Sequence, residues 1–256
     1  MGAIDDSIRH AISKLSSLHF ATTDIHRNRL IAMGEQPATV FNTGALGVWN
    51  MANAPVMSRS QLEASVGIDL SHDTLLVTYH PVTNDLVDPA VRFGALLKAL
   101  DRHPGCQVII TYPNNDPRGA VLISMIEDYQ KHNPGRVVAI PSLGALRYRS
   151  ALHYVSAVVG NSSSGVVEVP SAGVPVVNIG CRQMGRTASE AVINCGDDAE
   201  EIDAAITFAL SDQARQKAAA TPNPYQQPDT VGIIVSTIAS VDISTLLPKR
   251  FYDIKN

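Results

Sequence analysis

Short apolar runs alternate with longer amphipathic segments through most of the chain from residue 74 onward. The apolar runs are rich in β-branched residues and predict strands, whereas the segments with a period of 3.6 residues predict helices. The expected strands are 75–79, 107–112, 137–140, 157–159, 174–179 and 191–194. The expected helices are 91–100, 119–132, 143–154 and 199–210. This alternation is typical of a doubly wound α/β fold, a parallel sheet with helices on both faces.

The first 50 residues show the same alternation but hold too few strands for a sheet of their own. Helices are expected over 5–18 and 24–33, and short strands over 20–22 and 39–42. A βα unit begins with a strand, and no strand precedes the first helix. We therefore expect this first domain to lack its front portion; the alternative is a helical appendage on the main domain. Residues 50–73 are expected to form a linker with one short helix.

Polar residues stand where several expected strands end, namely His80, Asn114, Asn161 and Asn178. In a parallel α/β sheet, ligands bind outside the carboxyl ends of the strands. The sequence therefore predicts a ligand site at this edge of the sheet.

The most distinctive of these strand ends is a serine run, Gly160-Asn161-Ser162-Ser163-Ser164-Gly165, which precedes an expected helix. The first turn of a helix presents unpaired N–H groups and suits a phosphate, and flanking glycines would let the backbone approach a ligand closely. Glu168, about one turn later, could accept two hydrogen bonds from sugar hydroxyls. A phosphate beside a diol indicates a nucleotide, while the alternative is a serine-capped helix without a ligand.

Composition and charge exclude several other functions. The net charge of −4 and the pI of about 6.0 predict no nucleic-acid partner. No apolar stretch approaches the ~20 residues needed to span a bilayer, so we expect no membrane partner and a cytoplasmic location. The three cysteines, Cys106, Cys181 and Cys195, suit neither a disulfide framework nor a zinc site.

Five sequence blocks together resemble the hydrolysing UDP-N-acetylglucosamine 2-epimerases, a family of sialic-acid and related nonulosonic-acid synthesis. In chain order, the blocks are 2–15, 80–83, 112–114, 160–165 and 178–186. The resemblance implies two Rossmann-like domains in the B-type glycosyltransferase arrangement, the first one incomplete. Residues 1–55 would be the remainder of the N-terminal domain and 56–220 the UDP-binding domain. A C-terminal tail, 221–256, would pack a helix near 231–241 back toward the first domain.

The resemblance also implies a reaction in two steps. UDP is eliminated across C1 and C2 of UDP-N-acetylglucosamine or a related sugar, and water then adds to the glycal to give N-acetylmannosamine or the related epimer. Asp5 matches an acidic residue of the proton transfers, and Asp6 and Arg9 share its helical turn, with Arg9 spaced to pair with Asp5. His80 matches a histidine near the diphosphate. No metal or cofactor is implied.

Six further residues match the family's UDP site. Ser162 and Ser163 would hold the diphosphate with Arg182 near the phosphates, where a guanidinium suits the geometry. Glu168 would accept the ribose hydroxyls.

Asn114 would line the nucleotide cleft; the alternative interpretation is a turn residue without a ligand. Tyr148 would lie under the uracil; the alternative interpretation is a tyrosine of the core.

The chain departs from the family before its first helix, where the family carries a histidine-rich segment ending in a catalytic Gly-Gly-Glu. We therefore expect the chain as written to bind UDP weakly and to turn over poorly or not at all. The alternatives are a UDP-sugar-binding fragment without catalysis, a B-type glycosyltransferase and a non-hydrolysing epimerase. By resemblance, the protein would form a homodimer or homotetramer.

Overall fold

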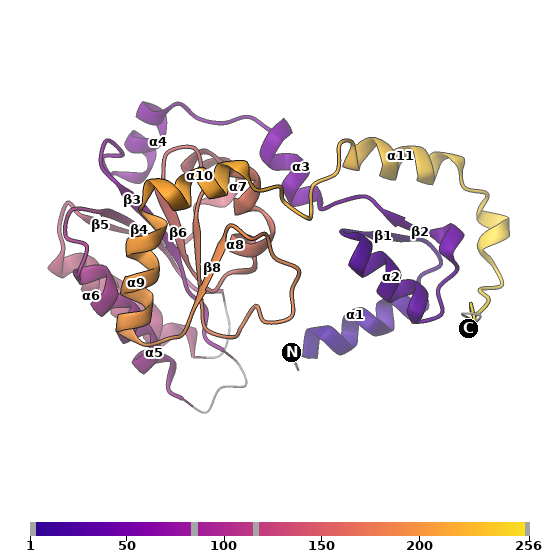
Figure 1. Cartoon of the computed structure of the whole chain (residues 1–256), viewed down its shortest axis with the longest axis horizontal. Helices are drawn as coiled ribbons and strands as arrows, with labels where there is room; N and C mark the ends of the chain where they lie inside the picture. The colour runs from indigo at the N-terminus through magenta and orange to yellow at the C-terminus, as the bar shows by residue number, and fades with distance from the viewer. Residues whose placement is uncertain (1–3, 83–86, 115–117, 254–256) are drawn as a thin grey trace. The chain divides into compact units, whose positions relative to one another are not determined.

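The computed structural model describes residues 4–82, 87–114 and 118–253, with the side chains of residues 4–6 left undescribed. The chain divides into two compact units. Unit 1 comprises Met1–Asn53 and Pro224–Asn256, and unit 2 comprises Ala54–Asn223. Each unit is described by itself below, and the ribbon diagram labels its elements (Figure 1).

Unit 2 is built on a six-stranded parallel sheet in the order β5-β4-β3-β6-β7-β8. Its strands are β3 (Thr74–Thr78), β4 (Gln107–Thr111), β5 (Val137–Ile140), β6 (Ala157–Gly160), β7 (Val176–Ile179) and β8 (Val192–Cys195). Counted within the unit, this is the order 3-2-1-4-5-6 of the Rossmann fold. The strand order therefore reverses between β3 and β6, which lie side by side with Thr78 opposite Gly160.

Helices cover both faces of this sheet (Figure 1). Consecutive residues of β3 point to opposite faces, and Leu75, Leu76 and Val77 are all fully buried. One face forms a single apolar core with the helices α5 (Pro89–Asp101), α6 (Gly119–His132) and α9 (Ala199–Ala209). The remaining helices of the unit are α4 (Arg59–Val66), α7 (Gly144–Ala151), α8 (Ser163–Val167) and α10 (Asp212–Ala220). The predicted doubly wound α/β fold is confirmed for this unit.

Two parts of the helix prediction were wrong. The stretch expected to hold one short helix contains α4 and the end of a further helix, α3 (Leu46–Asn53). α4 begins at a capping box, in which the Ser58 hydroxyl accepts from the Gln61 N–H and the Gln61 side chain accepts from the Ser58 N–H. α10 was not predicted; its alanine-rich sequence has little apolar periodicity, but the Ser211 side chain caps its start.

Gly160 allows β6 to approach β3 at the point where the strand order reverses. Its φ is 142°, and a Cβ atom at this position would lie 1.9 Å from the carbonyl oxygen of Thr78. A Cβ at Gly165 would meet the Val176 side chain at 3.1 Å. The space beside these glycines is thus filled by neighbouring strands, and the expected close approach of their backbone to a ligand stays a prediction.

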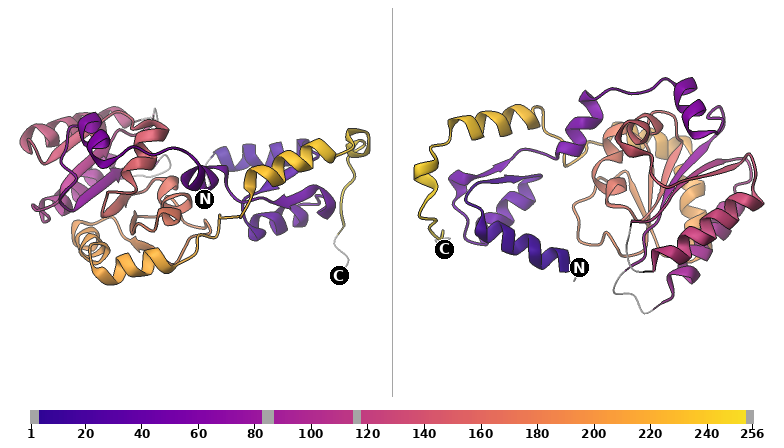
Figure 2. Two further views of the ribbon diagram at one scale, coloured as in Figure 1. Left: turned by 90° about the horizontal axis from the view of Figure 1, so that it is seen from above. Right: turned by 180° about the vertical axis from the view of Figure 1, so that it is seen from behind.

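Unit 1 joins both ends of the chain, as the violet and yellow segments show (Figures 1 and 2). It contains a two-stranded parallel sheet of β1 (His19–Ala21) and β2 (Val40–Asn42). Its helices are α1 (Ile4–Leu15), α2 (Asp24–Ala32), α3 and α11 (Thr230–Ser240). α2 packs on both strands and α11 contacts α3.

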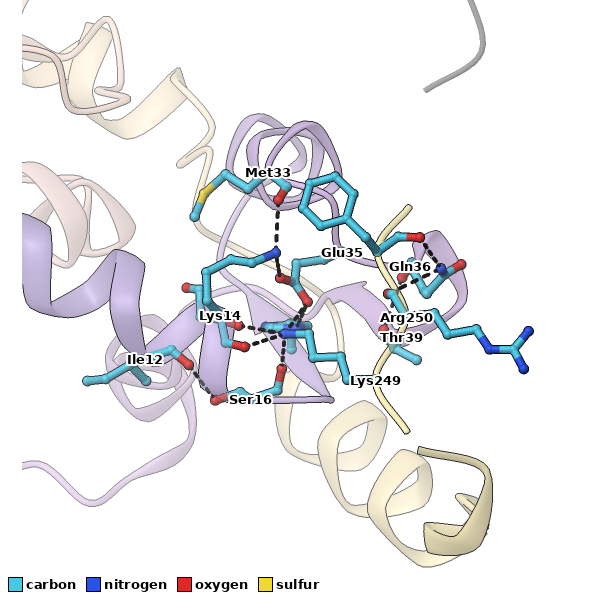
Figure 3. Close-up of polar contacts among 12 residues, drawn as sticks. Ile12, Lys14, Ser16, Met33, Glu35, Gln36, Thr39, Lys249 and Arg250 are labelled. Atoms are coloured by element: carbon cyan, nitrogen blue, oxygen red, sulfur yellow. Dashed lines mark hydrogen bonds and ion pairs between the residues drawn. The ribbon is translucent and has the colours of Figure 1, made fainter. Parts of the chain in front are cut away.

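A buried carboxylate ties the C-terminal segment of unit 1 to α1 (Figure 3). Glu35 is 1% exposed; it forms ion pairs with Lys14 at 2.7 Å and Lys249 at 2.6 Å and a hydrogen bond with His19 at 2.8 Å. The Lys249 ammonium also donates to three carbonyl oxygens at the end of α1, those of residues 13, 14 and 16. No local sequence pattern indicates this cluster.

Candidate functional site

The carboxyl ends of β3 and β6 meet where the strand order of unit 2 reverses, which is the expected ligand position in this fold. The loops that follow the two strands are joined by a reciprocal pair of hydrogen bonds. The His80 N–H donates to Oδ1 of Asn161 at 2.8 Å, and Nδ2 of Asn161 donates to the His80 carbonyl at 2.8 Å. Asn161 is 1% exposed, so both bonds are shielded from water.

The His80 ring is oriented by a third strand end. The backbone N–H of Asn114, after β4, donates to His80 Nδ1 at 3.2 Å. A ring nitrogen that accepts a hydrogen bond carries no proton, so the neutral imidazole has its proton on Nε2. In this tautomer Nε2–H is a hydrogen-bond donor, and a phosphate oxygen can accept from such a group.

The loop after β7 is fastened to the same asparagine. Arg182 Nη1 donates to the Asn161 carbonyl at 3.1 Å, and Gln183 Nε2 donates to it at 2.8 Å. Gln183 is buried, and its Oε1 atom has no hydrogen-bond partner within the described part of the chain. Three loops thus bring His80, Asn114 and Arg182 into one hydrogen-bonded network centred on Asn161. The sequence placed Asn161 at a strand end but did not indicate this role.

The serine run continues directly from Asn161. Ser162 is the N-cap of α8, and its hydroxyl accepts from the Ser164 N–H at 3.4 Å. α8 spans only five residues, and Glu168 is its C-cap rather than a residue one turn into a longer helix. A 3-10 helix, η2 (Val169–Ala172), follows because Pro170 cannot continue the α-helical hydrogen bonds. A helix this short has a weak dipole, so anion binding here would depend on the N–H groups of its first turn.

Tyr148, on α7, lies beside the serine run. Its phenol hydroxyl shares a hydrogen bond with Ser164 Oγ. Burial raises the pKa of Tyr148; the hydrogen bond to Ser164 opposes this rise, and the negative charge of Glu168 adds to it. The phenol is therefore neutral at physiological pH, and Tyr148, Ser164 and Glu168 form a second group next to the network around Asn161.

Asn178 has a structural partner instead of a place in this network. It is 5% exposed, and its Nδ2 donates to Asn194 Oδ1 at 2.8 Å between β7 and β8. A position at a strand end therefore does not by itself show whether an asparagine belongs to the network, as Asn161 does, or pairs with a neighbouring strand, as Asn178 does.

The remaining candidate residues belong to unit 1. Asp5 and Asp6 lie on α1, but their side chains are outside the described residues, so the expected pairing of Asp5 with Arg9 stays a prediction. Arg9 is exposed. His80 and the six residues predicted to bind UDP thus lie on unit 2, and the other three candidates lie on unit 1.

Two further observations concern metal ions and membranes. Within the described ranges, no three His, Cys, Asp or Glu side chains are grouped closely enough to hold a metal ion. None of the described helices combines the length and the apolar character that crossing a bilayer requires.

Solved structures of similar fold include UDP-N-acetylglucosamine 2-epimerases. The Neisseria meningitidis enzyme bound to UDP-GlcNAc matches with a TM-score of 0.69 and 19% identity, over 90% of this chain and 63% of that one. An S. aureus MnaA–UDP structure matches with a TM-score of 0.68 and 17% identity, over 95% of this chain and 65% of that one. At these identities the likeness concerns the fold, and it confirms the predicted fold class.

Curated relatives match more closely in sequence. The chain is 33% identical over 255 residues to the hydrolysing GDP/UDP-N,N'-diacetylbacillosamine 2-epimerase of Campylobacter jejuni, covering 99% of this chain and 66% of that protein. It is 30% identical to the UDP-N-acetylglucosamine 2-epimerase of Neisseria meningitidis serogroup B, covering 82% of this chain and 54% of that protein. The chain thus spans between half and about two thirds of these relatives' lengths.

The sequence family described as UDP-N-acetylglucosamine 2-epimerase matches residues 1–239, nearly the whole chain. The chain therefore belongs to the UDP-N-acetylglucosamine 2-epimerase family.

Proposed function

We propose that unit 2 binds the UDP group of a UDP-2-acetamido sugar at the carboxyl ends of β3 and β6. The observation that carries this proposal is the hydrogen-bonded network around Asn161, which brings three types of donor together at the carboxyl end of the sheet. His80 offers Nε2–H, Arg182 offers its guanidinium, and the run around Ser162 offers backbone N–H groups. These donors suit the oxygens of a diphosphate, and Glu168 suits the hydroxyls of a ribose.

We further propose that the protein acts as a hydrolysing 2-epimerase. In the first step, a base removes the C2 proton of the sugar while the C1–O bond breaks and UDP leaves with the electron pair. In the second step, water adds across C1 and C2 of the glycal and the free 2-epimer is released. Asp5 and Asp6 are the proposed proton-transfer residues and Arg9 their partner, and His80 would stabilise the departing diphosphate.

The name of the Campylobacter relative supports both the hydrolysing reaction and a diacetylbacillosamine-type sugar as an alternative to N-acetylglucosamine. A homodimer or homotetramer in the cytoplasm, acting in nonulosonic-acid synthesis, completes the proposal.

Two experiments test the proposal in order. Calorimetry with the 256-residue chain should detect UDP binding, which His80→Ala weakens. Incubation with UDP-N-acetylglucosamine or UDP-N,N'-diacetylbacillosamine, followed by product analysis, then identifies the reaction. Free UDP with a free 2-epimer supports the hydrolysing reaction, whereas a 2-epimer still attached to UDP contradicts it. UDP binding without turnover would support the binding fragment, and sugar transfer that requires an acceptor would support a glycosyltransferase.

A further inference from the structure

Asn161 joins two other segments of the proposed diphosphate site, the loop after β3 and the loop after β7, although neither a binding nor a catalytic role falls to it. We propose that Asn161 is a positioning residue that fixes His80 relative to Arg182, so that the phosphate half of the site depends on it and the nucleoside half does not. This inference rests on the proposed binding of UDP by unit 2.

The first step concerns His80. The Asn161 carboxamide accepts from the His80 N–H and donates to the His80 carbonyl, each at 2.8 Å. These two bonds fix the backbone on both sides of the His80 Cα atom and therefore the origin of its side chain. Only a carboxamide offers a donor and an acceptor with this spacing, and asparagine has the length to reach from this position.

The second step concerns Arg182. The Asn161 carbonyl oxygen accepts from both Arg182 and Gln183, at 3.1 and 2.8 Å. The Asn161 N–H donates to the Thr78 carbonyl at 3.2 Å and anchors the residue to β3. The side chain of Asn161 thus holds His80, and its backbone holds Arg182, the two residues whose side chains would face the phosphates. A shift of Asn161 moves both of them together.

The nucleoside half of the site has a separate support. Tyr148 comes from α7 and is hydrogen-bonded to Ser164, and Glu168 follows the end of α8. Both hydrogen bonds described for the Asn161 side chain go to the His80 backbone, after β3, and neither goes to these residues. Loss of the carboxamide should therefore weaken the binding of a diphosphate more than the binding of the nucleoside.

The test compares UDP with uridine. We expect Asn161→Ala to weaken UDP binding by about tenfold to a hundredfold in calorimetry, which corresponds to losing the two hydrogen bonds between the carboxamide and the His80 backbone. Uridine binding, measured by ligand-observed NMR, should change less than about threefold. Asn178→Ala is the matched control, because it removes another buried asparagine side chain at a neighbouring strand end. It should leave the ratio of UDP to uridine affinity unchanged.

A second variant covers the case in which Asn161→Ala does not fold. Gln183→Met has nearly the same size and removes one donor to the Asn161 carbonyl while leaving the His80 bonds in place. It should lower UDP affinity in the same selective way but by a smaller factor.

Equal loss of UDP and uridine binding in a folded variant, or no loss of either, would overturn the inference. Failure of the unaltered chain to bind UDP would instead overturn the proposed function on which the inference rests.

Discussion

Lys249 donates a hydrogen bond to the buried carboxylate of Glu35 across 2.6 Å, joining residues that are far apart in the sequence of unit 1. The same ammonium also donates to carbonyls at the end of α1, where its positive charge complements the helix dipole. α1 exposes Ile8, Ile12 and Leu15. Its C-terminal end is therefore an important point of attachment within unit 1.

We predict that Lys249→Met destabilises unit 1 by about 1–3 kcal/mol, because buried acceptors lose a charged donor. The chain's single tryptophan, Trp49, lies on α3 of this unit and reports its unfolding by fluorescence. Hydrogen exchange should also accelerate in α1. Arg250→Ala is the control, because the Arg250 guanidinium points away from the cluster (Figure 3). Equal effects of the two substitutions would contradict the prediction.

The Glu35 cluster should also make the stability of unit 1 depend on pH. Burial alone would raise the pKa of Glu35, but hydrogen bonds from Lys14, Lys249 and His19 lower it below the ordinary value of 4.5. A carboxyl whose pKa is lower in the folded state stabilises the fold above its unfolded pKa and loses this contribution as the pH falls. Urea unfolding followed by Trp49 fluorescence should therefore show a difference between the unaltered chain and Glu35→Gln at pH 7. That difference should shrink below about pH 4.5; a difference that stays constant down to pH 3 would refute this account.

Local sequence patterns predicted the sheet of unit 2 well, since the central strands β3, β4, β6 and β7 are short, mostly apolar runs that are buried on both faces. They also located His80 and Asn161 at strand ends. What they could not predict are partners set by tertiary contact. Glu35 appears in the sequence as one more acidic residue, and only the fold brings Lys249 to it. Asn161 and Asn178 look alike in the sequence, yet Asn161 joins the loops after β3 and β7, whereas Asn178 binds a neighbouring strand.

Gly160→Ala should disturb unit 2 at the centre of its sheet. The added Cβ would overlap the Thr78 carbonyl oxygen, and φ is positive, so β3 and β6 must separate. We expect a loss of about 2–4 kcal/mol, from backbone strain and overpacking together. Thermal unfolding followed by circular dichroism measures this loss of stability.

Gly67→Ala is the matched control for this substitution. Gly67 also has a positive φ, of 76°, but a Cβ there meets nothing within 4 Å. Its substitution should cost only the conformational strain of about 1 kcal/mol. If both glycine variants lost the same stability, the close approach to Thr78 would not be the cause.

Two substitutions of Tyr148 distinguish the contribution of its ring from that of its hydroxyl in the proposed nucleoside site. Tyr148→Phe keeps the ring and removes the bond to Ser164, so uridine binding should fall by less than about tenfold. Tyr148→Ala also removes the aromatic surface, and stacking on a base contributes ~1–3 kcal/mol, so uridine binding should fall about tenfold to a hundredfold. Because burial raises the pKa of Tyr148, affinity should not change between pH 7 and 9 through ionisation of this phenol. Unchanged uridine binding by a folded Tyr148→Ala variant would place the base elsewhere and leave Tyr148 as a core residue that supports α8.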